Sequence, residues 1–128
     1  MKLSAIKKLT VFILISMFTQ FSMAADNASA VSEIAGIVAG MNHFPSDADK
    51  TKLMAIAEDG MLAQGVRDMA TTVANIQHFP NDEGKAAMAR IMENEQAPEM
   101  AKTLASIIAN FAHMVGADDK AKLEAMMM

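Results

Sequence analysis

Three histidines are the residues of this chain best suited to chemistry, and they are evenly spaced. His43, His78 and His113 lie 35 residues apart both times, and the chain contains no other histidine. The imidazole ring is a frequent ligand of zinc and copper, and three equivalent rings are enough for one site if they converge. These residues are therefore the candidate metal ligands of the chain.

The local sequence around the histidines favours a structural role instead. No H-x-x-x-H or H-x-x-E pair places two ligands on one helical face. We expect equivalent positions of neighbouring helical units to lie about 10 Å apart, the usual helix-packing distance, which is too far to share an ion. Each histidine is expected in the last turn of a helix, where it caps carbonyl groups. A zinc or copper site and a response to pH remain alternatives.

Methionine is the second group with potential chemistry, because the chain has 14 of them. Thioether sulfur is a soft ligand that favours Cu(I). Met69, Met88, Met92 and Met126 nevertheless stand at apolar positions of the expected helices, where methionine readily fills irregular cores. We favour core packing, with a methionine-lined groove for a partner and a copper site as the alternatives.

The residues around the histidines repeat in the same register. Apolar residues recur every 35 positions, as in Ile34/Met69/Leu104, Val38/Val73/Ile108 and Leu53/Met88/Leu123. A period of 30 to 40 residues is the length of one helical hairpin in repeat proteins. The sequence therefore predicts three copies of one hairpin, over about 31–60, 66–95 and 101–128.

The helical spacing of apolar residues, together with residues that end or cap helices, divides each copy into two helices. Apolar residues follow the i, i+1, i+4, i+7 pattern of an amphipathic helix, and His-Phe-Pro at 43–45 and 78–80 ends the first helix. Ser46 and Asn81 are the expected N-caps of the second helix. The predicted fold is all-α, with the three hairpins arranged as a compact bundle or a short solenoid. The six helices are predicted over 30–43, 46–59, 63–78, 82–94, 98–114 and 117–127.

The N-terminal segment has the pattern of a secretory signal peptide. Lys2, Lys7 and Lys8 precede an apolar run over 9–18, and Ser22-Met23-Ala24 supplies small residues before a cleavage site. The run is shorter than the roughly 20 residues of a membrane span. We predict a signal peptide over 1–24, cleavage after Ala24, and a mature domain over 25–128 in the periplasm or outside the cell, with no stable membrane insertion.

Composition excludes several classes of function. A hydrophobic content of 52% excludes a disordered chain, and the absence of cysteine excludes a disulfide scaffold or a thiol enzyme. Cleavage after Ala24 would remove Lys2, Lys7 and Lys8. The 8 basic and 15 acidic residues that remain give a net charge of −7, which disfavours binding to nucleic acid.

No catalytic or phosphate-binding motif stands out in the sequence. We therefore expect a protein that is not an enzyme, holds no cofactor and binds a protein or peptide partner, with a chaperone-like role as one form of this. Periplasmic binding of copper or zinc through histidine and methionine is the alternative. The sequence leaves the oligomeric state and the identity of the partner open.

Overall fold

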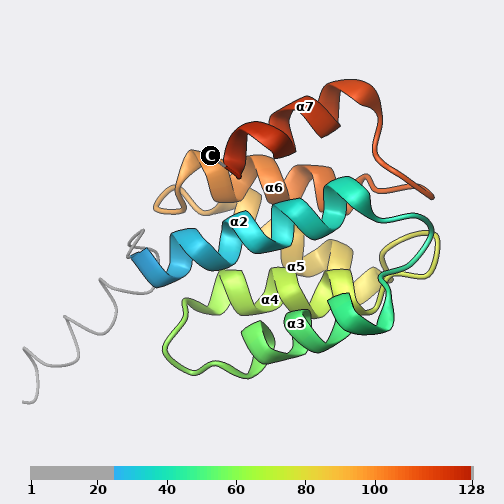
Figure 1. Cartoon of the computed structure of the whole chain (residues 1–128). Coiled ribbons are helices and arrows are strands. Elements are labelled where there is room, and N and C mark those ends of the chain that lie inside the picture. The colour runs from blue at the N-terminus through green and yellow to red at the C-terminus, as the bar shows by residue number, and fades with distance from the viewer. Residues whose placement is uncertain (1–24, 128) are drawn as a thin grey trace, which may run out of the picture.

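The computed structural model describes residues 25–127, which form an all-α bundle (Figure 1). Over these residues there is no strand, and none of the helices is both long and apolar enough to cross a membrane. The predicted signal peptide over 1–24 lies outside the described residues. The six helices of the described part are α2 (Ala25–Gly40), α3 (Asp47–Glu58), α4 (Gln64–Ala74), α5 (Asp82–Glu93), α6 (Glu99–Ala109) and α7 (Ala117–Met126).

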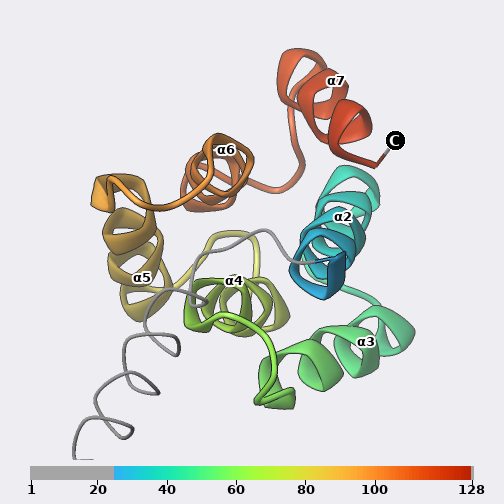
Figure 2. The same ribbon diagram turned by 90° about the vertical axis from the view of Figure 1, so that its left-hand side faces the viewer.

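The helices form a closed ring rather than an open solenoid. Viewed end-on, α2, α4 and α6 lie around the centre, and α3, α5 and α7 cover them from outside (Figure 2). Each outer helix packs closely against the inner helix that follows it: α3 on α4, α5 on α6, and α7 back on α2. The last helix of the chain therefore closes the ring on the first described one.

This closure changes the predicted helix pairs. The predicted first hairpin corresponds to α2 and α3, and the third to α6 and α7, yet within each of these pairs the helices contact one another little. The helices of the predicted second hairpin, α4 and α5, do pack closely, but the two closest pairs, α3 with α4 and α5 with α6, join helices from adjacent predicted copies. In a closed ring, each inner helix packs against neighbouring helices on more than one side. In isolated hairpins, the apolar residues on the outer face of each helix would stay in contact with water.

The core contains the apolar positions that the spacing singled out. Small residues on the inner helices, Ala35, Ala70 and Ala105, are fully buried and let these helices approach one another. The predicted core positions are thus confirmed. Side chains that are 0% exposed include Ile34, Met69, Leu104, Leu53, Met88 and Leu123.

Helix starts agree with the sequence better than helix ends. The side chains of Ser46 and Asn81 accept hydrogen bonds from the amides of Asp49 (3.1 Å) and Gly84 (2.7 Å), so both predicted N-caps are confirmed. At the other end, α2, α4 and α6 stop at residues 40, 74 and 109 instead of the predicted 43, 78 and 114. The first described helix also begins at residue 25 rather than 30.

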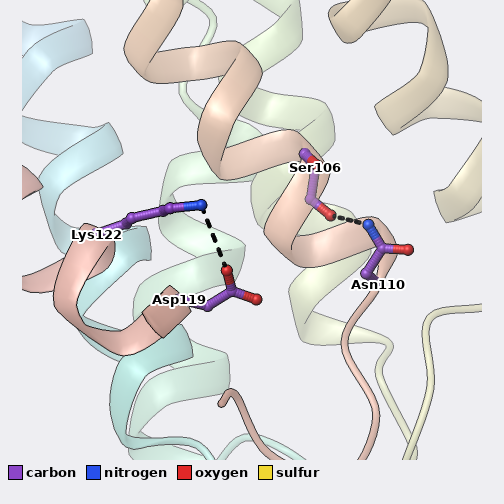
Figure 3. Close-up of polar contacts among 4 residues, drawn as sticks. All are labelled: Ser106, Asn110, Asp119 and Lys122. Atoms are coloured by element: carbon purple, nitrogen blue, oxygen red, sulfur yellow. Dashed lines mark hydrogen bonds and ion pairs between the residues drawn. The ribbon is translucent and has the colours of Figure 1, made fainter. Parts of the chain in front are cut away.

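Asparagine explains two of the early ends. The side-chain amide of Asn75 donates to the carbonyl of Thr71 (3.0 Å), and that of Asn110 donates to the carbonyl of Ser106 (2.9 Å; Figure 3). A side chain that bonds the last turn in this way competes with continuation of the helix. The chain therefore leaves the helix before it reaches the histidine.

One glycine sets how closely α5 approaches α4. A Cβ atom at Gly84 would lie 2.6 Å from Cγ2 of the buried Thr72, so the two helices touch where this residue has no side chain. The positions 35 residues before and after Gly84 are Asp49 and Asp119. The outer helices that carry these aspartates, α3 and α7, make few contacts with α2 and α6, respectively. This agrees with an aspartate side chain that keeps the two helices apart.

Candidate metal centre

The three histidines meet at one end of the bundle. They lie in the connections between α2 and α3, α4 and α5, and α6 and α7, which all lie at the same end (Figure 1). Their ring centroids are 5.0, 5.0 and 5.1 Å apart, and one ligand atom from each ring lies within 4.8 Å of the others. The expected separation of about 10 Å was wrong, because closure of the ring brings the three connections to a common point.

The backbone of the histidines forms a ring of three hydrogen bonds. The amide of His43 donates to the carbonyl of His113 (2.6 Å), and that of His78 donates to the carbonyl of His43 (2.7 Å). The amide of His113 donates in turn to the carbonyl of His78 (2.8 Å). Each histidine thus donates to one partner and accepts from the other, which fixes the positions of all three Cα atoms.

All three histidines have a left-handed backbone. Their φ angles are 69°, 68° and 64°, and they are the non-glycine residues with positive φ in the described part of the chain. At His43 and His113 the amide of the next residue donates to the carbonyl of the preceding one, Phe44 to Asn42 (2.8 Å) and Met114 to Ala112 (2.6 Å), as in a γ-turn. The histidines therefore lie in turns beyond the helices, and the predicted role as caps in the last helical turn was wrong.

This backbone conformation is uncommon for any residue that bears a side chain. A side chain in such a region costs about 1–3 kcal/mol, and glycine or asparagine adopts positive φ with less strain. Three residues of the same type share this backbone state and are held by one hydrogen-bond ring. Backbone strain of this kind concentrates at functional sites.

One pair of ring nitrogens lies at the separation expected of two ligands of a tetrahedral ion, and the cluster's ligand atoms all lie within 4.8 Å of one another. Nδ1 of His78 lies 3.2 Å from Nδ1 of His113. Two nitrogens that bind one tetrahedral zinc at 2.0–2.1 Å lie about 3.3 Å apart. The two nitrogens are also within hydrogen-bond distance of each other, and the ring tautomers set which one donates. His43 is half-buried, whereas His78 and His113 are exposed, so an ion can reach the site from solvent.

We call the three apolar residues that directly follow the histidines the rim. They are Phe44, Phe79 and Met114, whose exposed fractions are 56%, 51% and 59%. The Phe79 ring meets the His113 ring edge to face, with centroids 5.1 Å apart. Exposed apolar side chains that form a contiguous patch mark interaction sites more often than single exposed ones do.

Beneath the histidines the structure is closed. Met41, Ile76 and Phe111, two residues before each histidine, are at most 4% exposed. The prolines at 45 and 80 are also buried, two residues after the first two histidines. The chain on either side of the histidines is therefore anchored in the core, whereas the side chains of His78 and His113 are exposed to solvent.

The methionines that were assigned to the core by spacing lie there. Met69 and Met88 are 0% exposed, Met126 is 8% exposed, and Met92 packs against the core. Met114, in the rim, is an exposed methionine next to the histidines in sequence. The core interpretation is confirmed for the four named residues, and the rim contributes one thioether.

Three shallow grooves lie between the helices away from the histidines. Their volumes are about 310 Å³ between α2 and α3, 200 Å³ between α4 and α5, and 380 Å³ between α6 and α7. The smallest groove is the one that contains Gly84. In the largest, Lys122 pairs with Asp119 at 3.9 Å and Asn110 caps its own helix (Figure 3). These polar groups therefore serve the helices that bear them.

Comparison with models of protein families, with curated proteins and with solved structures finds no match for this chain. Interpretation of the site therefore depends on its geometry. Sequence reasoning named the three histidines as candidate ligands but did not predict their convergence. The equal spacing of the histidines was the available signal, and it becomes decisive only when the three units are known to close into a ring.

Proposed function

We propose that this protein binds a divalent transition-metal ion through His43, His78 and His113. The observation that supports this most directly is the cluster itself: three imidazoles on a shared backbone ring, with ligand atoms within 4.8 Å. Zinc and copper are the ions that imidazole ligands suit best, and a tetrahedral zinc matches the nitrogen separation between His78 and His113.

Preorganisation is the main physical support. The ring of backbone hydrogen bonds fixes the three Cα atoms before any ion arrives, so metal binding has to order only the side-chain torsions. Ligands that are already in place lose less conformational entropy on binding. The strain of three positive φ angles is then offset by the metal–nitrogen bonds that this backbone makes possible.

A competition titration with a chromophoric chelator tests the proposal. The purified protein should bind one Zn(II) with a dissociation constant of about 1 μM or lower, equivalent to roughly −8 kcal/mol. The variant with His43→Asn, His78→Asn and His113→Asn is the matched control, because asparagine tolerates positive φ and lacks the imidazole. A wild-type constant no tighter than about 1 mM, or equal binding by the control, would reject the site.

Binding of a protein or peptide partner is a second candidate function. The exposed rim of Phe44, Phe79 and Met114 favours it, since methionine and aromatic side chains adapt to varied apolar partners. If this function is correct, the protein suppresses aggregation of an unfolded model client, and the variant with Phe44→Ser and Phe79→Ser does so much less. Equal suppression by the two proteins would contradict a role of the rim.

We also propose that the chain is exported and arose from a threefold repeated unit of about 35 residues. Support comes from the basic and apolar pattern over 1–24 and from the equal spacing of the histidine turns. Cell fractionation and the intact mass of the purified protein test export: a mass that begins at Ala25, in the periplasm or medium, is expected. In this proposal the protein acts by binding and is not an enzyme.

A further inference from the structure

The proposed metal site has fewer protein ligands than a tetrahedral ion requires. Within residues 25–127, the cluster offers one ligand atom from each of three histidines and includes no carboxylate. Closed structural zinc sites use four protein ligands, whereas three-ligand sites keep a position for an external molecule. The fourth position would therefore be filled from solution.

Charge decides what kind of donor this position prefers. Imidazoles bind metal as neutral ligands, so three of them leave the full 2+ charge of the ion uncompensated. An anionic oxygen donor is attracted more strongly than a neutral one at a charged site of this kind. A carboxylate matches both the charge and the oxygen chemistry that zinc accepts.

The surroundings decide what the carboxylate is attached to. Met41, Ile76 and Phe111, two residues before each histidine, are buried, so an external ligand has to approach from the side on which His78 and His113 are exposed. There the rim residues, Phe44, Phe79 and Met114, are each more than half exposed and meet whatever lies beyond the donor atom. An apolar body placed among them removes apolar surface from water.

Taking the proposed metal site as the premise, we propose that the metal-loaded protein binds small carboxylates that bear an aromatic or alkyl group. The ion holds the carboxylate, and the apolar rim selects for the organic body. This class of ligand follows from three features that lie together: three neutral nitrogen ligands, an open coordination position and the exposed apolar side chains of the rim.

The test uses the protein loaded with Co(II), whose visible absorption reports changes in coordination. Benzoate and acetate are titrated separately at constant ionic strength. Benzoate should bind at least about tenfold more tightly than acetate, the factor expected if about 1.4 kcal/mol comes from contact of the phenyl group with the rim. The variant with Phe44→Ala and Phe79→Ala should bind Co(II) as the wild type does and lose most of this preference.

Met61→Ala is the matched surface control, because this methionine is 88% exposed and lies in the connection between α3 and α4, away from the histidine turns. It should leave the preference unchanged. Absence of Co(II) binding would overturn the metal site itself. Normal Co(II) binding with equal affinities for benzoate and acetate, or an unchanged preference in the double variant, would overturn only the carboxylate proposal.

Discussion

The amide of His43 donates to the carbonyl of His113 at 2.6 Å, which joins the first and last histidine turns of the chain. This bond completes the ring of three. It forms at one end of the bundle, and along its sides α7 completes the helical ring by packing on α2. The candidate site and the closure of the fold are therefore consequences of the same arrangement, and each can be tested through the other.

The left-handed backbone at the histidines predicts how the site tolerates substitution. His78→Gly should be more stable to urea than His78→Ala by about 1 kcal/mol, because alanine at positive φ is strained and glycine is not. Both variants lack the imidazole, so neither should bind metal tightly. Equal unfolding free energies of the two variants would contradict the positive φ at this position.

Metal should stabilise the folded protein in a pH-dependent way. At a free Zn(II) concentration 100 times the dissociation constant, the unfolding free energy should rise by about 2.7 kcal/mol. Protons compete with the metal ion for imidazole nitrogen, so this gain should be smaller at the lower pH. Urea unfolding with and without Zn(II), at pH 7.5 and pH 5, measures the effect. The triple asparagine variant should show no gain at either pH.

The contact between α4 and α5 makes Gly84 sensitive to a single methyl group. Gly84→Ala places a Cβ atom 2.6 Å from Cγ2 of Thr72 and should destabilise the protein by about 1–3 kcal/mol. Thr72→Ser removes that methyl group and keeps the hydroxyl that donates to the carbonyl of Asp68 (2.8 Å). The double variant should therefore recover part of the loss in urea unfolding.

Gly40→Ala is the control for this experiment, because a Cβ atom at Gly40 meets nothing within 4 Å. It should be neutral or slightly stabilising, as expected for replacing glycine in a helix. A loss as large as that of Gly84→Ala would show that the helix contact is not the cause.

Closure of the ring by α7 predicts a large effect of one buried leucine. Leu123 is 0% exposed, and Leu123→Ala should cost about 2–5 kcal/mol of unfolding free energy. Lys122→Ala on the same helix is the matched control. The ion pair of Lys122 with Asp119, at 3.9 Å, is exposed, so its loss should cost less than about 1 kcal/mol. Similar values for the two variants would argue that α7 does not close the core.

The sequence by itself determined the helices, the starts of all but the first described one, and the core. Periodicity placed Ile34, Leu53 and their counterparts in the interior, because burial of an apolar stripe is a local property of each helix. The caps at Ser46 and Asn81 were equally readable, since a side chain and an amide three residues away form them.

Only the tertiary structure decided that the histidines converge. Their approach depends on α7 returning to α2, a contact between opposite ends of the described chain that no local pattern encodes. The same closure holds three histidines at positive φ, a backbone state that local preferences disfavour and that the hydrogen-bond ring stabilises. Local physics specified the six helices, and long-range packing created the site.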